Sequence, residues 1–261
     1  MKIYQVDSFT DRPFAGNPAG VCILEGPRDE SWMQDVAREM NLSETAFIEA
    51  QGDAFGLRWF TPAVEVDLCG HATLASAHIL WETGTAADGA VIRFNTKSGP
   101  LFTKKKEGWI EMDFPAEPES ESPCPAALKM ALGAEPLYCG KNRFDYLLEL
   151  DSEKTVRELQ PDFGLLGTVQ MRGVIVTARS ASPGFDYVTR FFAPAVGVNE
   201  DPVTGSAQCC LGPFWEKRLG RNSFTGFQAS ARGGVFKVQN SSDRVLISGK
   251  AVTVLKGDIV G

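Results

Sequence analysis

Residues 60–72, FTPAVEVDLCGHA, and residues 192–207, FAPAVGVNEDPVTGSA, are two versions of one motif. In each version an aromatic residue precedes a Pro-Ala-Val turn, an acidic stretch, and a glycine that opens an apolar, helix-like run. Each run is followed by a Gly-containing turn and a hairpin pattern, at residues 98–114 and 232–248. The copies lie about half a chain apart, which indicates a duplicated domain, because solenoid repeats recur every ~20–50 residues.

The duplication predicts two halves, each with mixed strands wrapped around a buried central helix. Residues 72–81 (ATLASAHILW) are apolar on nearly all sides, as expected of a fully buried helix, and residues 207–215 (AQCCLGPFW) are their counterpart. Gly212-Pro213 interrupts the second run and predicts a kink or an early end, because proline removes a helix hydrogen bond.

Periodicity predicts the other elements of each half. In the first half we expect a loop at residues 11–20 and a left-handed helix end at Asn41. The expected strands and helices are strands 3–9, 21–24, 44–49 and 57–60 with helix 30–40, then strands 145–150, 173–178 and 186–192 with helix 152–160.

A polar, Pro-rich segment at residues 115–125 is the predicted linker between the halves. The predicted domains are residues 1–116 and 124–250, with 251–261 as a tail strand packing on either half.

Composition excludes several function classes. The net charge of −7 and the pI near 5.0 argue against nucleic-acid and membrane partners, both of which favour basic surfaces. No signal peptide, membrane span, nucleotide-binding loop or zinc-protease motif is expected. The six cysteines have no CxxC spacing and predict reduced thiols in a cytoplasmic protein. With two histidines in the chain, we expect no metal centre.

Gly70-His71 and Gly205-Ser206 stand where a loop enters each predicted central helix. The first N–H groups of a helix lack internal partners and carry the positive end of its dipole. Two matched helix starts therefore favour a site for an anion such as a carboxylate or an enolate, although glycine and serine also serve simply to start helices.

Two acids are candidates for proton transfer. Glu44 shares a strand face with Ala46 and Ile48 if the strand phase is as expected, and a carboxylate on an apolar face accepts a proton more readily. Spacing alone favours the alternative of a surface glutamate. Asp201, in EDPVTGS, suits either a turn or a functional carboxylate.

His71 follows a helix-opening glycine, so the dipole is expected to lower its pKa and keep the imidazole neutral. His78 lies two turns further along the buried helix and is expected to be a hydrogen-bonded core residue. The two copies offer unlike groups, a thiol at Cys69 in one and a carboxylate at Asp201 in the other.

The chain resembles the phenazine-biosynthesis PhzF-like family of the diaminopimelate epimerase-like superfamily. The motifs that carry the resemblance are VDSFTDRPFAGNPAGV at 6–21, NLSETAF at 41–47, DLCGHATLASAHIL at 67–80 and EDPVTGSA at 200–207. The resemblance implies an α+β, diaminopimelate epimerase-like fold of two pseudo-repeated halves, each a barrel-like sheet around a central helix. It also implies an active site between the halves, chemistry without a cofactor, and a homodimer.

The resemblance assigns roles to individual residues. It implies that Glu44 is the general acid/base, that His71 and Asp201 are its partners, and that Gly70, Gly205 and Ser206 contact the substrate. Cys69 occupies a thiol position of related racemases and is kept as a substrate contact. Because the second copy has Asp201-Pro202 instead of a cysteine, a two-thiol racemase is excluded.

We therefore expect an isomerase that abstracts and returns a proton on a small carboxylic acid. Proton transfer by Cys69 is a variant within the same chemistry. A non-catalytic small-molecule-binding or interaction module is the alternative from another class, because a fold does not fix a function.

Overall fold

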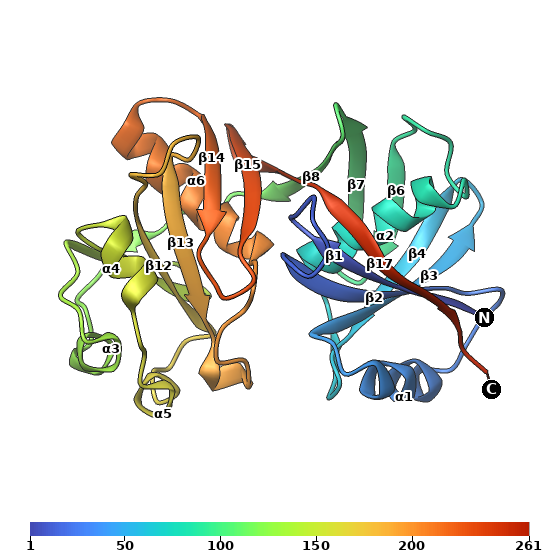
Figure 1. Ribbon diagram of the computed structural model, residues 1–261, viewed down its shortest axis with the longest axis horizontal. Coiled ribbons are helices and arrows are strands. Elements are labelled where there is room, and N and C mark those ends of the chain that lie inside the picture. Colours follow the sequence, from blue (N-terminus) through green and yellow to red (C-terminus); the bar gives the residue numbers. More distant parts are fainter. Residues whose placement is uncertain (261) are drawn as a thin grey trace. The chain divides into compact units, whose positions relative to one another are not determined.

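The computed structural model describes residues 1–260, which form two compact units (Figure 1). The first unit contains residues 1–113 and the chain from Ile247 onward, and the second contains residues 114–246. No helix within the described residues is long and apolar enough to cross a membrane.

The first unit is a mixed sheet with two helices. Its elements are β1 (Lys2–Ser8), β2 (Asn17–Ile23), α1 (Glu30–Met40), β3 (Glu44–Gln51), β4 (Ala54–Phe60), β5 (Glu65–Val66), α2 (Gly70–Glu82), β6 (Ile92–Thr96), β7 (Gly99–Lys106), β8 (Trp109–Pro115) and β17 (Ala251–Asp258).

The second unit repeats this order with additional short helices. Its elements are β9 (Ser120–Glu121), α3 (Ala126–Leu132), β10 (Tyr138–Lys141), β11 (Asp145–Glu149), α4 (Glu153–Glu158), α5 (Phe163–Leu166), β12 (Gly173–Arg179), β13 (Tyr187–Phe192), the 3₁₀ turn η1 (Pro194–Val196), α6 (Gly205–Leu219), β14 (Ser223–Gln228), β15 (Gly234–Ser241) and β16 (Arg244–Gly249).

Strand pairing confirms the predicted duplication. In the first unit the pairs β1–β2, β2–β3, β3–β4, β4–β6 and β6–β7 alternate between antiparallel and parallel. In the second unit the pairs β10–β11, β11–β12, β12–β13, β13–β14 and β14–β15 alternate in the same way. Since the helices also fall at corresponding connections, the two units are copies of one α+β topology.

Helix α2 is the core of the first unit. Ten of its residues are buried, on every side of the helix, as its apolar sequence predicts. It packs against β1, β2, β3 and β17. Strand β17 is the predicted tail, and it pairs antiparallel with β1 inside the first unit.

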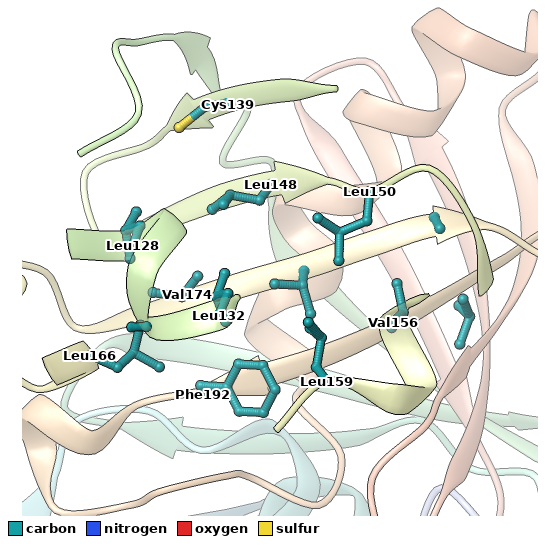
Figure 2. Close-up of a cluster of buried hydrophobic side chains, with 14 residues drawn as sticks. Leu128, Leu132, Cys139, Leu148, Leu150, Val156, Leu159, Leu166, Val174 and Phe192 are labelled. Carbon is teal, nitrogen blue, oxygen red and sulfur yellow. The ribbon is translucent and has the colours of Figure 1, made fainter. Parts of the chain in front are cut away.

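The second unit has its own apolar core on the side of the short helices (Figure 2). Leu128 and Leu132 of α3 and Leu166 of α5 pack against Val174 of β12 and Phe192 of β13. Helices α4 and α5 lie between β11 and β12 and so correspond in chain order to α1, whereas α3 precedes β10.

Helix α6 runs through Pro213 to Leu219, so the predicted early end is wrong. Proline at this position cannot donate to the carbonyl of Cys209, four residues earlier. The backbone N–H of Glu117 donates to that carbonyl instead, at 3.0 Å. The Pro-rich segment that supplies Glu117 was predicted to be a linker, and it lies within the second unit, where it also contributes β9.

Two details position the start of β3. Helix α1 ends at Asn41 in the left-handed conformation (φ 50°, ψ 37°), as predicted, and this turns the chain into Glu44. The loop between β1 and β2, predicted at residues 11–20, is shorter than predicted, because β2 already begins at Asn17. Strand β2 then pairs in parallel with β3, which places Ala19 beside Glu44.

A buried carboxylate, Glu153, holds the connection between β12 and β13. Its oxygens accept hydrogen bonds from the hydroxyls of Ser180 (2.8 Å) and Ser182 (2.7 Å), from two backbone N–H groups in the same turn, and from Arg157 (2.7 Å). Burial raises the pKa of this carboxyl, but Ser182, Ser180 and Arg157 outweigh it and lower the pKa to about 2.

We predict that Glu153→Gln destabilises the second unit by about 2 kcal/mol, because several donors lose a charged acceptor. Since the folded pKa is depressed, this contribution is complete above the unfolded pKa of about 4.3 and is lost as the pH falls towards 2. Urea unfolding at pH 7 and pH 3 measures both effects. Glu158→Gln, on the exposed face of α4, is the matched control, and equal losses in both variants would contradict the prediction.

Candidate active site

Helix α2 begins at Gly70 and carries His71 in its first turn. The hydroxyl of Ser8, at the end of β1, donates a 2.8 Å hydrogen bond to the backbone carbonyl of His71. This bond is buried and ties the start of the helix to the sheet. The orientation of His71 is therefore set by the core of the first unit.

The imidazole of His71 lies between a carboxylate and a thiol. Its Nε2 is 3.2 Å from Oε2 of Glu44, and its Nδ1 is 3.5 Å from Sγ of Cys69. The imidazole is 7% exposed, and the Glu44 side chain is 19% exposed. Three of the residues singled out from the sequence thus form one cluster, which we call the Glu44–His71–Cys69 centre.

Within this centre, Glu44 and His71 are close without being hydrogen-bonded. Oε2 of Glu44 and Nε2 of His71 are both buried, and neither has a hydrogen-bond partner among the described residues. At 3.2 Å the attraction is electrostatic, and both atoms keep the capacity to bond to a third group. A reacting molecule could engage both.

The expected pKa of His71 is wrong in direction. Burial lowers the pKa of the ring, but Cys69 and Glu44 beside it outweigh burial and raise the pKa well above its ordinary value. The helix dipole favours a lower pKa of His71, but the nearby carboxylate has the larger effect. The neighbouring carboxylate therefore favours the protonated form of His71, whose Nε2 faces Glu44.

Cys69 is a thiol in this setting. Burial and the nearby carboxylate of Glu44 both raise the pKa of Cys69, while His71 lowers it by less. Sγ lies next to the start of α2, where Cys69 is the N-cap residue without a side-chain capping bond. The thiol contacts Nδ1 of His71 and so fixes which way the ring faces.

The same three side chains lie close enough together to be considered as ligands of a metal ion. One ligand atom from each of Glu44, Cys69 and His71 lies within 4.8 Å of the others. However, the carboxylate and the thiol approach opposite nitrogens of one imidazole, and a single ion can take the lone pair of only one of them. The arrangement fits a chain of proton donors and acceptors better than a coordination sphere.

His78 is a hydrogen-bonded histidine, as predicted, although it is half-buried. Its Nε2 lies 3.1 Å from the hydroxyl of Thr253 and 2.8 Å from Glu82. Burial lowers the pKa of His78, so the pKa values of the two histidines are shifted in opposite directions.

The remaining predicted residues lie at the corresponding position of the second unit. Helix α6 begins at Gly205, and its N-cap Thr204 makes no side-chain capping bond. The hydroxyl of Thr204 donates to Oδ2 of Asp201 at 2.5 Å, and the Gln228 side chain donates to the Asp201 carbonyl at 2.7 Å. Ser206 is exposed at the helix start.

Two residues that support the starts of α2 and α6 were not predicted from the sequence. Ser8 lies within the motif at residues 6–21, but its bond to His71 spans 63 positions. Gln228 also accepts a 2.9 Å hydrogen bond from the backbone N–H of Thr204. No local spacing signals either contact, because both depend on how distant strands pair.

The family comparison covers nearly the whole chain. The family model PhzC-PhzF, described as phenazine biosynthesis-like protein, matches residues 6–257. An uncharacterized isomerase of Halalkalibacterium halodurans is 56% identical over 99% of this chain and 98% of its own length.

Solved structures agree with the sequence matches. A phenazine biosynthesis protein of the PhzF family from Enterococcus faecalis has a TM-score of 0.95 and 41% identity, over 99% of this chain and 98% of its own. A probable proline racemase from Agrobacterium radiobacter shares the fold alone, with a TM-score of 0.66 and 10% identity over 99% of this chain and 92% of its own. The predicted diaminopimelate epimerase-like fold is thereby confirmed.

We predict that Glu44→Gln lowers the pKa of His71 towards its ordinary value, because the substitution removes the carboxylate that stabilises the imidazolium. The stability that a raised pKa provides is complete below the unfolded pKa of about 6.5 and is lost as the pH rises through the folded value. NMR titration of the two imidazoles measures the change, with His78→Gln to assign the signals. An unchanged His71 titration in the Glu44→Gln protein would contradict the account of the centre.

Proposed function

The chain belongs to the phenazine biosynthesis-like PhzC-PhzF family, and from this premise we propose that it is a cofactor-independent isomerase. Its reaction is the abstraction and return of a proton on a small carboxylic acid, with Glu44 as the general acid/base. The observation that carries the proposal is the 3.2 Å approach of the Glu44 carboxylate to the His71 ring, within a buried centre.

Glu44 is suited to carry a proton in both directions. Its carboxylate stands at the first residue of β3, so the sheet holds it in place, and it is still partly accessible. When Glu44 accepts a proton from a carbon acid, the charge that balanced His71 disappears. His71 then has a stronger tendency to donate a proton from Nε2 to an oxygen of the substrate.

The start of α2 is suited to hold the anion that proton removal creates. A carbon acid beside a carboxylate or carbonyl becomes an enolate, and its oxygen needs positive partners. The first N–H groups of α2 are not capped by a side chain, and the His71 imidazolium stands in the same turn. These donors favour a carboxylic acid as substrate.

Asp201, Gly205 and Ser206 belong to the proposal through the resemblance to the family. The start of α6 repeats the start of α2 in being without a side-chain cap. In the proposal Gly205 and Ser206 supply a second set of donors for the substrate, and Asp201 supplies a second carboxylate. Gly70 plays the same part as Gly205 in the first unit.

Cys69 is the second candidate for the acid/base role, because its Sγ is 3.5 Å from His71 Nδ1. The raised pKa of the thiol weighs against it, since a base must be deprotonated at working pH. We assign Cys69 instead to holding the ring of His71 and lining the substrate site. A non-catalytic binding module could also use the unpaired Glu44 and His71 atoms to hold a ligand, so the proton-exchange variants below distinguish the two functions.

Two broader features complete the proposal. A cytoplasmic protein is proposed from the composition and the cysteine pattern. A homodimer is proposed from the resemblance, and sedimentation as a monomer at micromolar concentration would contradict it.

We predict that the protein catalyses incorporation of solvent deuterium into at least one member of a panel of cyclic and amino carboxylic acids. Glu44→Gln should lower this exchange by about 10²–10⁴-fold, because the amide cannot accept the proton. Mass spectrometry reads the exchange without the product being known. Glu49→Gln, on the same strand, is the matched control and should keep normal exchange.

Cys69→Ala separates the two acid/base candidates. Retained exchange within about tenfold assigns Cys69 to positioning, whereas a loss as deep as that of Glu44→Gln assigns it the proton transfer. Exchange at the wild-type rate in Glu44→Gln would refute the role of Glu44. If ligand binding is tight and unaffected by either variant while no acid exchanges, the binding-module function is favoured.

A further inference from the structure

Two cysteines outside the Glu44–His71–Cys69 centre come together in the second unit. Cys139 lies on β10, and Cys124 lies between two prolines just before α3. Strands β9 and β10 are antiparallel, with Gly140 paired with Glu121. The bond from the Ser122 N–H to the Cys139 carbonyl, at 3.0 Å, extends this pairing by one residue.

This pairing brings the two side chains onto one apolar surface. Ser122 lies opposite Cys139, and Cys124 follows Ser122 by two residues. In an extended chain the Cys124 side chain lies on the same face as that of Ser122, next to Cys139. Cys139 belongs to the buried cluster shown in Figure 2, at its rim, and Cys124 packs against the same cluster. The Cys124 thiol points to the carbonyl of Pro125, 3.9 Å away, and Cys139 is near enough to raise the pKa of this thiol.

We propose that Cys124 and Cys139 form a disulfide when the protein meets a peroxide, which makes the pair a redox modification site. Cys124 loses its proton and attacks one oxygen of the peroxide, whose O–O bond breaks to leave a sulfenic acid and one water. The Cys139 sulfur then attacks the Cys124 sulfur, the S–O bond breaks, and the second water leaves. Two thiols are oxidised to one disulfide, and hydrogen peroxide is reduced to two waters.

Access selects this pair among the six free cysteines. Cys124 is partly exposed, whereas the other five are buried. The first step therefore falls on Cys124, and Cys139 is the resolving thiol. Burial, followed by the neighbouring Cys139 side chain, raises the pKa of Cys124 to about 12, so the reaction is slow and needs a sustained excess of peroxide.

The disulfide would fix the entry of the chain into the second unit. Tyr138, beside Cys139 on β10, packs its ring 5.6 Å from the ring of Phe214 on α6. A covalent link from the segment before α3 to β10 restricts the unfolded chain while keeping these native contacts. Oxidised protein should therefore unfold at a temperature several degrees higher than reduced protein.

The experiment treats the full-length protein with excess hydrogen peroxide under native conditions, blocks free thiols, and digests with trypsin. Cleavage after Lys129 places Cys124 in residues 107–129 and Cys139 in residues 130–141. We expect the two peptides linked, at about 2 Da below their summed mass, and released by a thiol reductant. In Cys139→Ser, Cys124 should instead accumulate as a sulfenic acid that dimedone traps.

Cys210→Ala removes a fully buried thiol of α6 and should leave both the linkage and the rise in unfolding temperature intact. Cys124→Ser should abolish both. Linkage of either peptide to residues 191–217, which carry Cys209 and Cys210, would overturn the proposal. So would irreversible oxidation of Cys124 without any linked product in the wild-type protein.

Discussion

Burial of α2 is the constraint on which the rest of the first unit depends. A helix that is apolar on every side must be covered on every side, and β1, β2, β3 and β17 supply that cover. The same burial fixes where the helix begins. Since Ser8 of β1 binds the carbonyl of His71, and β3 starts at Glu44, the packing of the core also sets the distance between the proposed base and its partner.

The duplicated topology explains how one fold offers unlike groups for chemistry. Each unit presents the start of a buried helix without a side-chain cap, at Gly70 and at Gly205. The residues around these starts differ, with the Cys69 thiol and the His71 imidazole in one copy and the Asp201 carboxylate in the other. In the proposed function, the repeated backbones provide donors for an anion, and the differences between the copies provide the acid–base groups.

Much of the fold could be read from the sequence because its signals are local. The left-handed turn at Asn41 and the burial of α2 each depend on residues near one another in the chain, and the duplication is visible as two similar local motifs. The failures were contacts between distant segments. Helix α6 continues past Pro213 because the Glu117 N–H reaches the free carbonyl of Cys209, and the pKa of His71 is raised because β3 brings Glu44 beside it. Without the family motifs, the spacing around Glu44 favoured a surface glutamate, since only strand pairing brings it to His71.

The central claim is that Glu44 carries a proton to and from a carbon acid held at the start of α2. A crystal structure with a carboxylic acid that undergoes exchange, bound to the inactive Glu44→Gln protein, tests it most directly. We expect the exchanging carbon to lie roughly 3–3.5 Å from the side chain at position 44, with an acid oxygen at the first N–H groups of α2. A ligand whose exchanging carbon faces away from position 44 would contradict the account.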